Sequence, residues 1–210
     1  MIKTCVVILP LSLAIGCSSN SKPIATEAHI DPADSLASLS KNPNDSLRNP
    51  SNYFYLSDLP TRHIGELILS DSIRALQNEI SYRCLDSLTT QDAASRSFYF
   101  KVFSKVISNP DGPLSEVVGE YAKKYIESYP KEFAVYAAGF SKTQKEVWAY
   151  QTVEYVLADV EAQRINKASE WTDKVLRGCE SCNYAQLNAI KDFTAYVLRA
   201  AKDKEDTDTN

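Results

Sequence analysis

The sequence predicts an all-α protein: a globular bundle of about six antiparallel helices, preceded by a disordered tether. Three observations support this fold class. Apolar residues recur at three- and four-residue steps over most of the chain beyond residue 58. Prolines, glycines and capping residues interrupt this pattern where helices would end. No alternating apolar and polar run, and no hairpin signal between β-branched segments, indicates a strand.

The first part of the helical region predicts two helices. Apolar residues at helical spacing from Ile64 to Leu88 indicate one helix of about 25 residues. A second stripe starts near Asp92 and ends at residues 109–113, where prolines and a glycine force a turn. Asp111 is placed to cap the helix that follows.

A third helix is expected from Leu114 to Tyr129, with apolar and tyrosine side chains on one face. Pro130 stops it, because proline cannot donate to the helical hydrogen-bond ladder. A short helical piece from Lys131 to Ala138 follows and closes at Gly139. Short connections of this kind favour antiparallel neighbours.

The next helix is expected to be long. Ser141 and Gln144 have the spacing of a capping box, in which each side chain satisfies a free backbone amide. The apolar pattern weakens at residues 165–168, where the helix can break, and it ends at Gly178, a natural left-handed cap.

The last helix begins at a second capping box, formed by Asn183 and Gln186. Its apolar stripe continues to Ala201. The helical domain therefore covers residues 59–202, and residues 203–210 are expected to form a disordered, charged tail.

The N-terminus has the layout of an export signal, because Lys3 precedes an apolar run from Val6 to Gly16. This run is about half the ~20 residues needed to cross a bilayer. Gly16 directly precedes Cys17, and Leu13 lies shortly before both. These residues resemble the lipobox of bacterial lipoproteins, although Leu13 lies one place earlier than the leucine of that pattern. The resemblance implies cleavage before Cys17 and acylation of that cysteine, by palmitate or a similar chain.

Residues 1–16 are then a signal peptide, and residues 17–58 are the lipidated cysteine followed by a flexible tether rich in Ser, Asn, Asp and Pro. The aromatic segment at residues 53–56 is expected to fold back onto the domain. The resemblance implies a bacterial cell-envelope protein, anchored to a membrane by lipid on the periplasmic side or the cell surface. The alternative is a plain secretory signal with Cys17 an ordinary thiol.

The charge of the chain excludes one class of partner. The formal net charge is −4, from 23 basic and 27 acidic residues. A chain without a strong positive field has little attraction for phosphate backbones. Nucleic acid is therefore not expected to bind.

The spacing of Cys179 and Cys182 allows a disulfide, a redox pair or two metal ligands. A thioredoxin-type redox site needs a βαβ setting, and a four-thiol zinc site needs a second pair, whereas only Cys84 remains in the helical region. We therefore predict no metal and no cofactor. A structural disulfide between two of these three cysteines is expected.

Catalytic motifs are absent from the sequence. It has no P-loop, no Gly-x-Ser-x-Gly elbow, no His-Glu-x-x-His and only two histidines. The acidic residues Glu146, Glu154 and Asp159 indicate a solvated face. The protein is not expected to be an enzyme.

Three tyrosines recur every four residues, at Tyr121, Tyr125 and Tyr129. Such amphipathic rings can line a binding face, because they bury area while keeping a polar tip. The alternative is that they pack the rim of the helical core.

These observations favour a lipid-anchored envelope protein with a protein-binding helical domain. A second hypothesis is a small-ligand-binding bundle with a tyrosine-lined pocket. A third is a thiol-based redox protein that uses Cys179 and Cys182.

Overall fold

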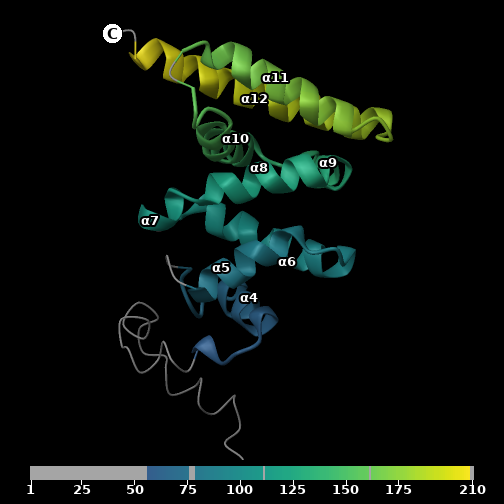
Figure 1. The fold of residues 1–210 in the computed structure, drawn as a ribbon. Coiled ribbons are helices and arrows are strands. Elements are labelled where there is room, and N and C mark those ends of the chain that lie inside the picture. The colour runs from purple at the N-terminus through teal and green to yellow at the C-terminus, as the bar shows by residue number, and fades with distance from the viewer. Residues whose placement is uncertain (1–55, 76–78, 111, 161, 209–210) are drawn as a thin grey trace, which may run out of the picture.

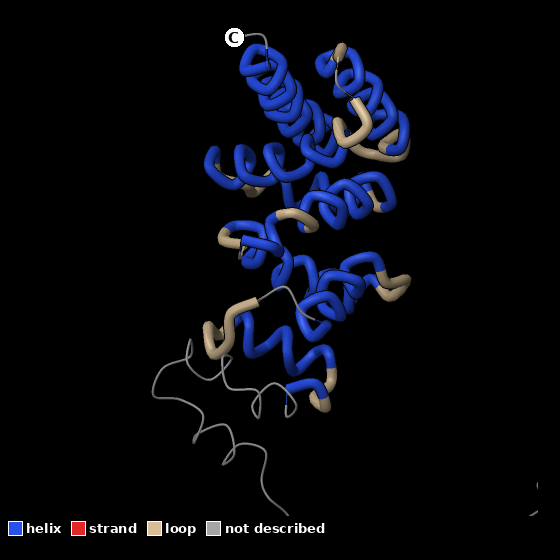
Figure 2. The backbone as a smooth tube through the Cα atoms, turned by 60° about the vertical axis from the view of Figure 1, so that its left-hand side comes forward, coloured by secondary structure: helices blue, strands red, loops and turns tan. Residues whose placement is uncertain are grey.

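The computed structural model describes residues 56–75, 79–110, 112–160 and 162–208, which are largely helical and contain no strand. The all-α bundle that the sequence predicts is confirmed. The helices follow one another in chain order from α4 at one end to α11 and α12 at the other (Figure 1). Figure 2 shows the same stack with short loops between helices. The elements are α4 (Thr61–Leu69), α5 (Glu79–Asp86), the 3-10 helix η1 (Ser87–Thr89), α6 (Ala93–Ser108), α7 (Gly112–Ser115), α8 (Val118–Ser128), α9 (Pro130–Ala137), α10 (Lys142–Val156), α11 (Arg164–Gly178) and α12 (Tyr184–Asp208).

The single helix expected from Ile64 to Leu88 is wrong, because α4 ends at Leu69 and α5 begins at Glu79. Asp71 adopts a left-handed conformation with φ 60°. The Ser70 hydroxyl donates to the Leu67 carbonyl at 3.1 Å. Serine and aspartate side chains that bond to nearby backbone compete with the helical ladder, so the apolar spacing continues where the helix does not.

The second helix is confirmed as α6. The Asp92 carboxylate accepts from the Ser95 amide at 2.8 Å and caps its start. The third helix is divided into α7 and α8, with a break at residues 116–117. Pro130 is the first residue of α9, a position at which its missing N–H costs nothing. The capping role expected for Asp111 falls on a residue outside those described.

The long helix expected after Ser141 is divided earlier than the sequence indicates. Its capping box is confirmed, with Gln144 N to Ser141 Oγ at 3.2 Å. However, α10 ends at Val156, and Gln163, with φ 61°, precedes α11. Gly178 is not a left-handed cap, since the described glycines all lack positive φ. A Cβ at residue 178 would lie 3.1 Å from Pro130 Cγ, so close packing, rather than backbone freedom, favours glycine there.

The capping box at the start of α12 is confirmed, because Asn183 and Gln186 exchange two hydrogen bonds of 2.9 Å. The disordered tail expected at residues 203–210 is wrong as far as the chain is described, since α12 continues to Asp208. Contacts from two other helices hold this end. Arg164 Nη1 donates to the Lys204 carbonyl at 2.9 Å, and the Lys204 ammonium pairs with Glu154.

Aromatic side chains fill the centre of the bundle around Trp148 of α10. Its ring centroid lies 5.2 Å from that of Phe103 and 5.5 Å from that of Phe133, which in turn lies 4.8 Å from that of Phe193. These side chains are buried, and each large apolar side chain contributes roughly 1.5–3 kcal/mol by burial. The cluster joins α6, α9, α10 and α12 and so fixes the position of α10.

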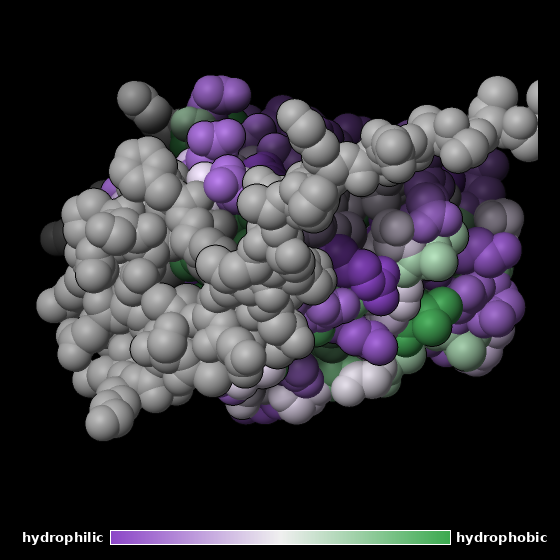
Figure 3. All heavy atoms as spheres, turned by 90° about the horizontal axis from the view of Figure 1, so that it is seen from below, coloured by the Kyte–Doolittle hydropathy of each residue, from purple (hydrophilic) through white to green (hydrophobic). Residues whose placement is uncertain are grey.

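Other contacts hold the flanks and the N-terminal end. Glu127 of α8 accepts hydrogen bonds or ion pairs from three side chains of α8 and α11: Lys123, Trp171 and Lys174. Leu56 is buried in the core, whereas residues 53–55 of the segment expected to fold back lie outside the described residues. Seen from the α4 end, the described surface is mainly hydrophilic with scattered apolar side chains (Figure 3).

Candidate functional site

A groove of about 1300 Å³ runs between α10 and α12 and reaches the α10–α11 connection. We call it the α10–α12 groove. Of the two helices that line it, α12 lies at the end of the helix stack farthest from α4, and α10 lies between α12 and α8 (Figure 1). Its lining combines acidic, basic, aromatic and apolar side chains: Glu146, Tyr150, Glu154, Leu157, Ala158, Asp159, Val160, Arg164, Tyr196, Arg199, Ala200, Asp203, Lys204 and Thr207.

Two ion pairs fix how α10 and α12 lie beside each other. Lys145 Nζ is 2.6 Å from Asp192 Oδ2 near the start of α10, and Lys204 pairs with Glu154 near its end. Because the order along α10 matches the order along α12, the two helices run in the same general direction. Of these four residues, Glu154 and Lys204 line the groove.

Three of the lining residues recur every four positions on α10: Glu146, Tyr150 and Glu154. Residues four apart lie above one another on one helix face. The tyrosine ring is therefore flanked by a carboxylate one turn before it and another one turn after it. Tyr150 is 53% exposed, which is unusual for a large ring in this domain.

Both tyrosine rings of the groove face cations supplied by α12. Lys204 Nζ lies 4.6 Å from the centroid of Tyr150, and the Arg199 guanidinium lies 5.3 Å from the centroid of Tyr196. A cation within about 6 Å of an aromatic face is attracted by the ring quadrupole. The groove is thus already organised for contacts between cations and aromatic rings.

The lining has a limited set of chemical groups. None of its residues is histidine, cysteine or serine, so it offers no nucleophile beside an imidazole base. Among the described residues, no group of three or more His, Cys, Asp or Glu is placed to hold a metal ion. The site can supply ion pairs, cation–π contacts and apolar floor residues such as Leu157.

The tyrosines expected to form a binding face lie elsewhere. Tyr125 is fully buried, and its hydroxyl donates to Glu132 Oε1 at 2.9 Å. Burial and this hydrogen bond raise the pKa of Tyr125 well above its usual range. Tyr121 donates to Asp86 Oδ1 at 3.0 Å, and Tyr129 donates to a carbonyl of η1 at 3.2 Å. The prediction that Tyr125 belongs to a binding face is wrong, because a ring in the core cannot meet a partner. Tyr125 instead packs in the helical core, as in the alternative.

A buried ionic network, not anticipated from the sequence, explains the placement of two of these rings. Arg96 is 7% exposed and donates to Glu132 Oε2 through Nη2 at 2.7 Å and Nε at 3.1 Å. Tyr129 covers the guanidinium at 3.9 Å. The network joins α6 to α9 and shields the charges, a structural role in which every partner is satisfied.

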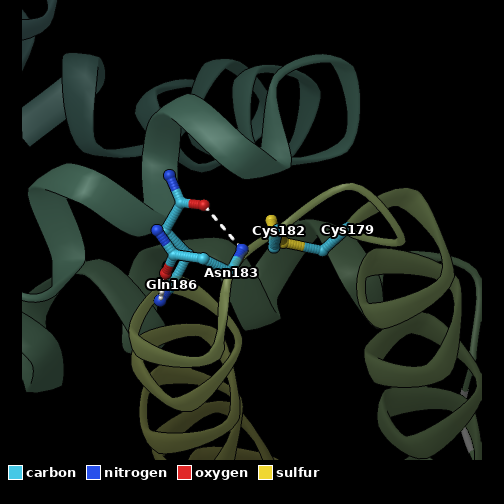
Figure 4. Close-up of a disulfide and its surroundings, with 4 residues drawn as sticks. All are labelled: Cys179, Cys182, Asn183 and Gln186. Atoms are coloured by element: carbon cyan, nitrogen blue, oxygen red, sulfur yellow. Dashed lines mark hydrogen bonds between the residues drawn. A yellow bond between two sulfur atoms is a disulfide. The ribbon is translucent and has the colours of Figure 1, made fainter.

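The cysteines are also accounted for within the described chain. Cys179 and Cys182 form a disulfide, with a Cα–Cα distance of 5.1 Å, in the turn between α11 and α12 (Figure 4). The capping box of Asn183 and Gln186 follows immediately. Cys84 is a free, buried thiol whose pKa is raised to about 11, mainly by burial. The predicted lipidation site Cys17 lies outside the described residues.

Comparisons with protein-family models, curated proteins and solved structures find no match to this chain. Within the described part of the chain, no helix has both the length and the apolar character needed to cross a bilayer.

The sequence indicates a solvated face at Glu146, Glu154 and Asp159 and does not single out Tyr150. A signal for the groove was present in the repeat of carboxylate, tyrosine and carboxylate every four residues. The missing information was tertiary, because the pairing of α10 with α12 joins residues about 50 positions apart.

Proposed function

We propose that this protein is a lipid-anchored component of the bacterial cell envelope whose helical domain binds a segment of a partner protein in the α10–α12 groove. The observation that carries the proposal is the groove itself. It is open, lined by both signs of charge, and contains two tyrosines, one of them largely exposed. Aromatic and arginine side chains are the residues most enriched where proteins contribute binding energy.

The size of the groove favours a chain segment over a small molecule. Small-ligand sites are typically enclosed clefts of about 300–1,000 Å³ with a mostly apolar lining. The groove exceeds that range and carries seven charged residues in its lining. The small-ligand hypothesis is therefore the second candidate.

The redox hypothesis has less support. A redox-active cysteine needs an accessible thiolate of lowered pKa. Burial raises the pKa of Cys84, so that thiol stays protonated at neutral pH. The Cys179–Cys182 disulfide closes the turn directly before the capping box that starts α12, which favours a structural role for it.

The partner-binding proposal can be tested in cells that express the full chain. A photo-crosslinking amino acid is placed at Tyr150, and a matched variant carries it at Tyr184, which is 81% exposed on the same helical pair and outside the groove. The expected result is one crosslinked protein at position 150 and none at 184. Crosslinking at both positions, or at neither, would contradict the assignment of the groove.

The anchor is tested separately by labelling cells with an alkyne analogue of palmitate. The wild-type chain should incorporate the label, and Cys17→Ser should not, because the acyl chain is proposed to be attached at that residue. Cys84→Ser is the matched control and should still be labelled. Label that persists on Cys17→Ser would refute the lipid anchor.

A further inference from the structure

We infer that the α10–α12 groove recognises a lysine side chain of the partner segment, at a site formed by the Tyr150 ring and the carboxylates of Glu146 and Glu154. This inference rests on the proposed function and adds the chemistry of the bound group. In the free protein the site is partly filled by Lys204 of the same chain.

The position of Lys204 shows what the site accepts. Its ammonium lies 4.6 Å from the centre of the Tyr150 ring and pairs with Glu154 at the same time. An aromatic face and a carboxylate each attract an ammonium, and here both act on the same one. Lys204 is therefore an internal ligand of this site.

The other half of the site is open. Glu146 lies one turn before Tyr150, and its side chain is 48% exposed. Its ion pair with Lys142, four residues earlier, is long at 3.7 Å and exposed, so it contributes little. A second ammonium can thus approach the Tyr150 ring from the Glu146 side, or it can displace Lys204 on the Glu154 side.

The two arginines of the groove have contacts of their own. Arg199 lies over Tyr196, and Arg164 donates to the backbone carbonyl of Lys204. Asp159 and Asp203 add further negative charge to the lining. On α10 itself the lining residues that carry charge are Glu146 and Glu154, so this side of the groove favours an incoming cation.

An internal ligand makes a specific prediction about competition. If Lys204 occupies part of the site, removing its charge frees Glu154 and one face of Tyr150 for an external lysine. Affinity for a lysine peptide then rises, whereas loss of a binding residue would lower it. The contact from Arg164 goes to the backbone, so Lys204→Gln leaves that support of α12 in place.

The experiment uses the full chain purified in detergent micelles and a fluorescein-labelled Gly-Ser-Lys-Gly-Lys-Ser-Gly peptide, with binding followed by fluorescence anisotropy. We expect Lys204→Gln to bind about threefold more tightly, and Tyr150→Leu or Glu146→Gln to bind about threefold more weakly, because exposed cation–π contacts and ion pairs are each weak. Lys191→Gln, which removes the same charge on α12 outside the groove, is the matched control and should leave affinity unchanged.

A second arm identifies the recognised group. The same peptide with acetylated lysines keeps its length but loses the charge, and it should bind at least about tenfold more weakly. The inference is overturned if the acetylated peptide binds equally well, or if Lys204→Gln weakens binding. If one of these contrary results is found and a partner is still crosslinked at position 150, the lysine site is refuted and the proposed function is not.

Discussion

Gly119→Ala is the sharpest test of how the groove-bearing helix is held. Gly119 lies in the first turn of α8, where that helix crosses α10. A Cβ at this position would overlap the backbone oxygen of Gln151 and lie 2.7 Å from Cδ2 of Tyr155. A backbone atom cannot move by a rotamer change, so α8 and α10 must separate by on the order of 1 Å.

The magnitude follows from two opposing effects. Forcing an extra methyl into a close-packed contact costs about 3 kcal/mol when backbone must shift. Alanine recovers up to about 1 kcal/mol of helix propensity over glycine. The net loss is about 2 kcal/mol, which corresponds to a fall in Tm of about 4–8 °C for a domain of this size.

The assay is thermal unfolding of the full chain, followed by far-ultraviolet circular dichroism. Gly112→Ala is the matched control, because a Cβ there would have no atom within 4 Å. Its Tm should equal or exceed that of the wild type. If Gly119→Ala unfolds within about 1 °C of the wild type, the close approach of α8 to α10 is refuted.

Three further predictions concern charge and sulfur. Burial alone would raise the pKa of Glu127, but hydrogen bonds from its lysine and tryptophan partners outweigh burial and lower it. Glu127→Gln should therefore be less stable than the wild type at about pH 7. The difference in stability should vanish as pH falls below about 4, where the wild-type carboxylate becomes protonated. Urea unfolding across that pH range measures the difference. Cys84 should resist iodoacetamide at about pH 8 in the folded chain and react on unfolding, because burial raises its thiol pKa; mass spectrometry measures this, and rapid labelling of the native chain would contradict it. Replacing both Cys179 and Cys182 by alanine should lower the free energy of unfolding by about 2 kcal/mol, since the bridge closes a very short loop; an unchanged urea midpoint would show that the capping box alone holds the turn.

The parts of the fold that depend on local chemistry could be predicted from the sequence. Ser141 and Asn183 each start a helix with the side-chain cap expected of them. Local rules suffice there, because both partners of each contact lie within three residues. The break at Asp71 is the opposite case, since apolar periodicity continues across it while the backbone turns.

The candidate site could not be predicted in the same way. Tyr125 belongs to a regular tyrosine stripe, yet its hydroxyl lies against Glu132 inside the bundle. Tyr150 lies in no such stripe, yet it is exposed beside α12. Helical spacing gives the relative positions of side chains on one helix, but not which face the neighbouring helices cover.

The position of the groove constrains how an anchored chain would use it. α4 lies at one end of the helix stack, and α12, one of the two helices that line the groove, lies at the other (Figure 1). A chain proposed to be attached to lipid at Cys17 enters the domain beside α4, so the groove end is the end farther from the attachment. The 40 residues from Cys17 to Leu56 can span at most about 140 Å. With the proposed anchor, a chain of this length would let the groove meet a partner over a wide range of distances from the membrane.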